Sequence, residues 1–362
     1  MTKRGIQQEY NLGQYFRDIY GDFLGETYRP PQLYVSHGVD NRTSVSAEAM
    51  MAGLFPPKNG QIWNPQLLWQ PIAMHTDETL DQVSTGISGP CPVYTETVWN
   101  DRRYKDIEKY IDPLVVQLLR NRTGEYLRDG HWLNKAIDSV KSRYYINDSR
   151  YEVPDWAAPH IDKFIKSSLN FHTEMLNIQN DTVGAFHLEL IMSNVEEHLE
   201  CRRDPEFQKK MVFFSGHDTN IMALMIALNM KYDFYDVPYF ASHLAVELHE
   251  FDGQYFVEFW LSENMTAART RLNPEFCTNP CSLNQLQEIT KNARMQRPQF
   301  NFICSGVTKS LFEEKSNAII TGSMLILVAI LLLSTIILGC TTYSYRKQLK
   351  QMQDPERRAL LS

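Results

Sequence analysis

Met211-Val-Phe-Phe-Ser-Gly-His-Asp-Thr-Asn220 is the stretch of this 362-residue chain that decides the fold. Its first four residues form a continuous apolar run, which is typical of a strand covered on both faces of a sheet. The strand is predicted to end at Gly216, with His217 and Asp218 on the turn, and residues 219–230 are predicted to form a helix directly behind it. A polar turn between a buried strand and a helix is where an open α/β sheet places its ligand site.

The side chains of His217 and Asp218 offer a chemistry that acts on anions. The start of a helix presents free N–H groups and positive potential to a negative ligand. An imidazole can share charge with a phosphate group, and a carboxyl group can pass a proton to a leaving oxygen. The structural alternative is that Asp218 only caps the helix and that His217 packs locally.

Apolar spacing predicts further elements on both sides of this stretch. Upstream, 6–24 and 46–54 are predicted helices, 33–35 is a predicted strand, and 36–43 is a predicted polar loop. The segment between them and the decisive strand is mostly helical in pattern, with candidate helices at 107–119, 133–140, 161–178 and 185–199.

Two more strands are predicted downstream, at 244–248 and 256–260, with Asp252-Gly253 as the turn. The whole pattern predicts an α/β fold, in which a central sheet carries helices on both faces and a helical insertion. The predicted boundaries are 1–84 for the first part of this domain, 85–205 for the mainly helical insertion and 206–310 for the second part.

Composition excludes several classes of function. The net charge is −7, which does not favour nucleic-acid binding, and the chain has neither a P-loop nor a dinucleotide-binding glycine motif. We therefore expect no cofactor and no nucleic-acid partner. Hydrophobic residues make up 43% of the chain and charged residues 22%, as in a packed globular protein.

Residues 318–340 read AIITGSMLILVAILLLSTIILGC, without a charged side chain. A helix of this length can cross about 30 Å of hydrocarbon. Basic residues outnumber acidic ones after the segment, which predicts that 341–362 form a cytosolic tail and that 1–317 are lumenal or extracellular. In this single-pass type I topology, a lumenal domain of this size needs an N-terminal signal segment to cross the membrane. The first residues are polar and show no apolar signal segment, so the natural start is expected to lie elsewhere.

Five glycosylation sequons and five cysteines precede the apolar segment, on the side where disulfides form. A bridge could close the short loop from Cys277 to Cys281. A metal site is the rival interpretation of that pair, but no second Cys or His pair follows at zinc spacing. We therefore predict no metal site. The sequon asparagines are Asn41, Asn121, Asn147, Asn180 and Asn264.

Phe214-Ser-Gly-His-Asp-Thr-Asn220 resembles the second signature of the histidine acid phosphatases. The resemblance extends over Met50-Met-Ala-Gly-Leu-Phe-Pro-Pro57 and Ile62-Trp-Asn-Pro-Gln-Leu-Leu-Trp-Gln-Pro-Ile72, and it covers the chain from about residue 5 to residue 304. It implies that this chain is a phosphate monoester hydrolase of acid pH that works without metal, through a phosphohistidine. By the same resemblance, Asp218 is the proton donor and His217 contacts the phosphate.

The family's nucleophilic histidine belongs to an Arg-His-Gly motif on a strand that would precede the segment matched here, and no Arg-His-Gly occurs in these 362 residues. A second departure is Ser36, which stands where the family has an arginine that clamps phosphate. We therefore expect no nucleophile and no phosphatase activity. One alternative is Ser36-His37-Gly38, which superficially resembles the missing motif and would make His37 the nucleophile.

The resemblance also assigns further residues. It pairs Cys91 with Cys304 and Cys277 with Cys281, and it leaves Cys201 unpaired. It places His75 at the edge of the pocket, and His243 and Glu247 on a strand behind the site. His187 and His198 fall on a predicted helix and are interpreted as surface or core residues.

In the tail, Glu356 with Leu360-Leu361 resembles an acidic dileucine signal that sorting adaptors bind, and Cys340 is a candidate for palmitoylation. These features, with the family's lysosomal members, predict a lysosomal, endosomal or cell-surface membrane glycoprotein. Its expected partners are a phosphate monoester or other small ligand, the membrane, sorting adaptors and a second copy of the chain. The alternative function is a non-catalytic binding protein on the same fold.

Overall fold

The structure is a computed structural model that describes residues 1–81, 91, 101–123, 129–179, 183–202, 204, 208–265, 267–305 and 342. The chain divides into two compact units, Met1–Ser305 and Gly306–Ser362. Only one residue of the second unit is described. The described fold is therefore that of the first unit, which is an α/β structure as predicted.

Three parallel strands form the first sheet, in which β1 (Leu33–His37) lies between β2 (His75–Thr76) and β3 (Met211–Ser215). The register pairs His37 of β1 with Ser215 of β3, so both strands end at the same edge. The decisive strand is confirmed, but its first four residues are only half-buried. The expectation of full cover on both faces is therefore wrong, and among the described strands β3 lies at one edge of this sheet.

A second sheet is antiparallel and contains β4 (His243–Phe251), β5 (Gln254–Ser262), β6 (Thr270–Leu272) and β7 (Cys281–Ser282). The predicted turn at Asp252-Gly253 is confirmed, since both residues have positive φ, at 49° and 75°. The single central sheet that we expected is wrong. Among the described strands, β3 pairs only with β1 and β4 only with β5, so no ladder joins the two sheets.

Two long helices lie beside the first sheet, where α2 (Asn41–Leu54) packs against β1 and α1 (Lys3–Leu24) packs against α2. Gly13 and Gly53 mark their crossing, because a side chain on either would collide with the other helix's backbone. Both predicted helices are confirmed. The predicted loop 36–43 is wrong at both ends, since β1 continues to His37 and α2 begins at Asn41.

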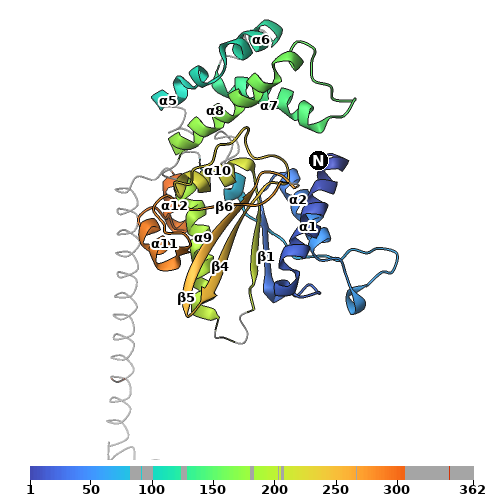
Figure 1. The fold of residues 1–362 in the computed structure, drawn as a ribbon, viewed down its shortest axis with the longest axis vertical. Coiled ribbons are helices and arrows are strands. Elements are labelled where there is room, and N and C mark those ends of the chain that lie inside the picture. Colours follow the sequence, from blue (N-terminus) through green and yellow to red (C-terminus); the bar gives the residue numbers. More distant parts are fainter. Residues whose placement is uncertain are drawn as a thin grey trace, which may run out of the picture. The chain divides into compact units, whose positions relative to one another are not determined.

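Among the described residues, six α-helices follow before the last strands: α5 (Arg102–Lys105), α6 (Pro113–Thr123), α7 (Gly130–Ile146), α8 (Ile161–Gln179), α9 (Val183–Cys201) and, after β3, α10 (Asp218–Ala227). The predicted helix 107–119 is wrong, because a 3₁₀ turn, η4 (Ile107–Tyr110), ends before Pro113 begins α6. α5 to α8 lie together in Figure 1. The helices α11 (Leu283–Thr290) and α12 (Arg297–Cys304) close the unit.

A buried ion pair connects α7 to the segment that precedes β4. Lys141 Nζ lies 3.1 Å from Asp236 Oδ1, and the two side chains are 6% and 1% exposed. Ser168 of α8 accepts a second hydrogen bond from Lys141, and Tyr145 donates to the other oxygen of Asp236. Buried charges need such partners, so this pair fixes α7 and α8 to the rest of the unit.

Both predicted disulfides are present, Cys91–Cys304 and Cys277–Cys281, and Cys201 is a free, half-buried thiol. Within the part of the chain that the structure describes, none of the helices combines the length and apolar character needed to cross a bilayer. The predicted membrane segment 318–340, Cys340 and the tail motif at Glu356, Leu360 and Leu361 lie outside the described residues, as does Asn180.

Candidate active site at the ends of β1 and β3

His217 stands at the start of α10, directly after β3, where the sequence predicted a polar turn. It is the residue that precedes the helix, so Asp218 is already the first helical residue. The Asn220 side chain accepts a hydrogen bond from the His217 backbone N–H at 2.6 Å. Its amide donates to Leu80 O and contacts His187 Nε2, at 3.0 and 2.8 Å. Asn220 thus fixes the turn that carries the predicted catalytic pair.

The His217 ring is 7% exposed, and both of its nitrogens have partners. Arg42 Nη2 lies 3.3 Å from Nδ1, and Asp81 Oδ1 lies 2.8 Å from Nε2. A guanidinium has only donors, so Nδ1 must accept from Arg42. Nε2 therefore carries the proton and donates it to Asp81, a tautomer that follows from the hydrogen-bond network.

Asp81 ends a short 3₁₀ helix, η3 (Glu78–Asp81), and its side chain is 16% exposed. Its second oxygen accepts a hydrogen bond from the backbone N–H of Val39, just beyond β1. The carboxylate therefore joins the end of β1 to the start of α10. Neither its position in the chain nor its neighbours in the sequence signalled this role.

The charges around His217 do not favour an anion. Asp40 forms an ion pair with Arg42, and its Oδ2 lies 3.9 Å from His217 Nε2. Asp81 and Asp218 add two more carboxylates, and Asp218 Oδ1 accepts from the Thr219 backbone N–H at 2.8 Å. Of the described groups at or next to the His217 ring, Asp40, Asp81 and Asp218 are acidic and Arg42 is basic, whereas a phosphate site needs an excess of donors and positive charge.

Asp40, Asp81 and His217 have ligand atoms within 4.8 Å of one another, close enough for a metal ion. The Arg42 guanidinium already pairs with Asp40 and lies at the His217 ring, and Nε2 carries a proton. A metal would need that proton removed and a second cation tolerated beside it. The donor set therefore does not fit an open metal site.

A second group of three possible ligands, Glu247, His249 and Glu258, lies on the antiparallel sheet. Its two carboxylates are paired with Arg269 and Arg271. Glu247 also accepts from Tyr20 of α1. Its described contacts hold α1 and the second sheet together, and they do not connect it to His217.

Ser36 is buried at 1% exposure, and its hydroxyl donates to the His75 carbonyl of the neighbouring strand at 3.2 Å. The neutral side chain at this position thus serves the contact between β1 and β2. The His75 ring is exposed and stacks on Tyr34, with ring centroids 4.7 Å apart. The position of His75 at the edge of the pocket, which the family resemblance implies, stays a prediction.

His37 ends β1 and is half-buried, with its Nδ1 2.6 Å from the carbonyl oxygen of Gly38. Because a carbonyl only accepts, Nδ1 carries the proton and the lone pair of Nε2 is left for another partner. This is the tautomer that a nucleophilic imidazole needs. His37 and His217 thus follow adjacent parallel strands at the same edge of the first sheet.

The remaining predicted histidines fall in different surroundings. His187 is buried and reaches the site through Asn220, a link that helix periodicity did not signal. His243 is 9% exposed and meets the Phe16 ring edge-on at 4.8 Å. Burial, with a smaller effect of Arg269, lowers the pKa of His243 to about 4.

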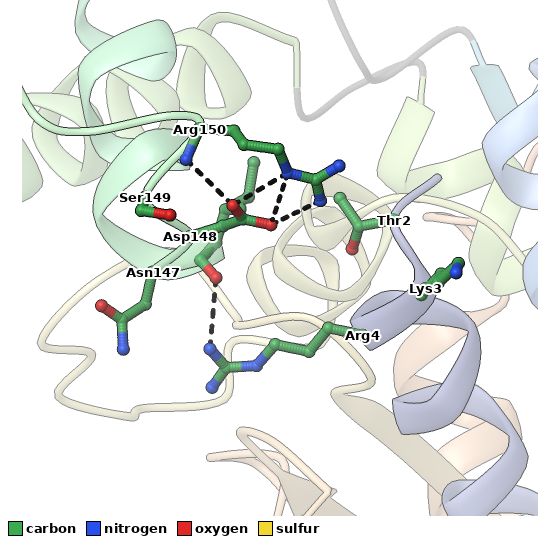
Figure 2. A pocket seen from close by; sticks show the side chains of 8 residues that line it. Thr2, Lys3, Arg4, Asn147, Asp148, Ser149 and Arg150 are labelled. Carbon is green, nitrogen blue, oxygen red and sulfur yellow. Dashed lines mark hydrogen bonds and ion pairs between the residues drawn. The ribbon is translucent and has the colours of Figure 1, made fainter.

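The described sequon asparagines differ in accessibility. Asn41, Asn121 and Asn147 are exposed, whereas Asn264 is half-buried and its side-chain oxygen accepts from the Ala267 backbone N–H at 2.9 Å. Asn147 also lines a cavity of about 360 Å³ between the start of α1 and residues 146–150, where Arg4 donates to the Ile146 carbonyl (Figure 2). This cavity is lined by none of the residues around His217.

Comparison with known proteins gives a consistent result. The family model described as histidine phosphatase superfamily (branch 2) matches residues 1–262. Prostatic acid phosphatase of Bos taurus is 29% identical over 300 residues, which cover 80% of this chain and 75% of that protein. Lysosomal acid phosphatase of Rattus norvegicus is 27% identical over 303 residues, which cover 80% and 69%.

Among solved structures, Hafnia alvei phytase in complex with tartrate matches with a TM-score of 0.58 at 16% identity, covering 82% of this chain and 88% of that one. A likeness at that identity shows the fold alone. The family match spans both sheets up to Ser262 and includes the His217-Asp218 turn. The chain therefore belongs to branch 2 of the histidine phosphatase superfamily.

Proposed function

We propose that this chain is a histidine acid phosphatase family protein that does not hydrolyse phosphate monoesters and instead binds a ligand or partner on the same fold. The observation that carries the proposal is the chain of contacts Arg42–His217–Asp81. By the family resemblance His217 contacts the phosphate and does not attack phosphorus. Its Nε2–H already donates to the Asp81 carboxylate and its Nδ1 accepts from Arg42, so both ring nitrogens are engaged by protein groups in place of a phosphate ligand.

The charges at the site support the same proposal. A phosphate monoester carries negative charge into the site and needs cations or N–H donors around it. Here Asp40 and Asp81 lie at the His217 ring, Asp218 follows it in the chain, and Arg42 already pairs with Asp40. The neutral Ser36 adds no positive charge. The named relatives are acid phosphatases, but these residues depart from what their chemistry needs.

The test is a turnover assay on the full-length chain in detergent at acidic pH. We expect no release of nitrophenol from its phosphate ester above the rate of the Asp218→Ala variant. A rate that exceeds background in the wild type and falls to background in Asp218→Ala would show that the proposal is wrong.

A second candidate is an active phosphatase whose nucleophile is His37. The observation that favours it is the contact of His37 Nδ1 with the Gly38 carbonyl, which leaves the Nε2 lone pair available. In that case a radiolabelled phosphate monoester would leave an acid-labile phosphoryl group on His37. His37→Ala would abolish the label, whereas His249→Ala, which changes an exposed histidine of the other sheet, would keep it.

We further propose that residues 318–340 anchor the protein as a single-pass type I membrane glycoprotein of lysosomes, endosomes or the cell surface. The uncharged segment, the sequons before it and the tail motif at Glu356, Leu360 and Leu361 support this. Protease protection in isolated membranes should leave 1–317 intact and remove a tag on the tail. Cleavage of the untagged N-terminal part in sealed vesicles would contradict the topology.

Of the described sequons, we expect sugars on the exposed Asn41, Asn121 and Asn147 and less on Asn264, whose side chain is engaged. The measurement is the shift in mass of each asparagine-bearing peptide after deglycosylation. Sorting adaptors and a second copy of the chain remain proposed partners. Sorting by adaptors would be supported if the Leu360→Ala variant is lost from internal membranes. Sedimentation velocity in detergent would measure whether two copies of the chain associate.

A further inference from the structure

The carboxylate of Asp81 occupies the place where the donors of this site converge. One oxygen accepts from His217 Nε2 at 2.8 Å, and the other accepts from the Val39 backbone N–H. These two donors come from the start of α10 and from the end of β1. An oxyanion that binds at the carboxyl ends of these strands would use the same donors.

Gly38 shows how closely the carboxylate is seated. A β-carbon built on Gly38 would collide with the Asp81 carboxylate, so this position cannot carry a side chain while Asp81 stays in place. With the side chain of Asp81 only 16% exposed, the contact is enclosed by protein on several sides. The carboxylate is therefore a fixed part of the site.

We propose that Asp81 is the residue that excludes phosphate from this site, by holding an internal carboxylate on the donors that phosphate would need. The inference rests on the proposed function, in which the family's site is retained but idle. Phosphate can reach the His217 Nε2–H and the Val39 N–H only if Asp81 leaves, since both groups are negative and use the same two donors. Asp81 therefore decides which ligands the site accepts.

The experiment measures the affinity of the full-length chain in detergent for inorganic phosphate, by titration calorimetry. Asp81→Ala removes the carboxylate and should bind phosphate at least ~10-fold more tightly than the wild type, because a like charge is removed at close range. Asp81→Asn keeps the shape and removes the charge, and it should change in the same direction. Glu78→Ala is the matched control, since Glu78 is an exposed carboxylate on the same short helix.

A second variant should move the Asp81 carboxylate away from the two donors without changing Asp81 itself. Gly38→Ala places a methyl group against the carboxylate and should displace it, so phosphate affinity should also rise. Adding His217→Ala to Asp81→Ala should remove the gain, because the Nε2 donor is lost. Thermal unfolding of each variant confirms that it is folded.

Equal phosphate affinity in the wild type, Asp81→Ala and Asp81→Asn would overturn the inference, as would a gain of the same size in Glu78→Ala. These outcomes are distinct from failure of the proposed function. Turnover of a phosphate ester by the wild type would contradict the lack of hydrolysis, whereas the binding of inorganic phosphate is measured without turnover.

Discussion

His217 and His243 are both enclosed by protein, but their surroundings differ in kind. The His217 ring has a partner on each nitrogen, Arg42 on one side and Asp81 on the other. His243 lies against the aromatic rings of Tyr15 and Phe16, and neither of its nitrogens has a hydrogen-bond partner among the described residues. The first imidazole belongs to a polar network at the strand ends, and the second is part of an apolar contact.

The difference shows why burial alone does not identify a site. A buried polar group without partners costs free energy and stays neutral, as the lowered pKa of His243 indicates. A buried imidazole that joins two charged side chains has a defined tautomer and a defined orientation. His217 therefore has the geometry of a functional residue, whereas the described contacts of His243 are those of a packing residue.

The largest expected effect concerns His243 and pH. Its pKa falls from the usual 6.5 to about 4 on folding. The unfolded chain therefore binds more protons between these values, and stability rises with pH in that window. The free energy of unfolding should fall by about 3 kcal/mol as pH drops from 6.5 through 4, from 1.36 kcal/mol per pKa unit.

Chemical denaturation of the wild type and of His243→Phe at several pH values measures this dependence. Phe keeps the ring against Phe16 and cannot titrate, so its stability curve should be flatter between pH 4 and 6.5. His249→Phe is the control, because His249 is 51% exposed. Parallel curves for wild type and His243→Phe would mean that His243 is not a neutral, buried group.

The next effect concerns Asn220, which holds the His217 turn. Asn220→Ala removes the acceptor for the His217 backbone N–H and the donor to Leu80 O. We expect a loss of about 2 kcal/mol, as for other helix caps with additional buried hydrogen bonds. Asn170→Ala is the control, since Asn170 makes one longer bond to Tyr110 O. Equal losses in both variants would contradict a special role for Asn220.

The smallest expected change in stability is that of Arg42→Ala. The Arg42 side chain is 57% exposed, so its pair with Asp40 should contribute no more than about 1 kcal/mol. The informative readout is the His217 ring in ¹⁵N-correlated NMR spectra. Without the guanidinium, Nδ1 loses its donor, but the Asp81 carboxylate can only accept and should still hold the proton on Nε2, so the ring should keep the same tautomer. A mixture of tautomers in Arg42→Ala would show that Asp81 alone does not set the position of the ring proton.

Local sequence patterns were enough to specify the elements that carry the candidate site. The apolar run that ends before Gly216 and the polar pair that follows it predicted a strand, a turn and a helix, which are β3, His217 and α10. These are local signals, because the periodicity of apolar residues and the preference for helix-capping residues depend only on neighbouring positions in the sequence. The family signature lies in the same stretch, whereas the pairing of Cys91 with Cys304 came from the family resemblance and not from local spacing. The break at Pro113 was missed, although proline at the start of a helix is itself a local signal.

Only the tertiary structure decided what surrounds His217. Asp81 is separated from it by 136 residues and Arg42 by 175, and no period or motif links them. The separation of the strands into two sheets was also decided there, since pairing is a long-range choice among exposed strand edges. Local patterns encode elements, whereas the charge balance of a site depends on which distant elements fold together. That is why the sequence located the phosphate-type turn but could not show that a carboxylate already occupies its donors.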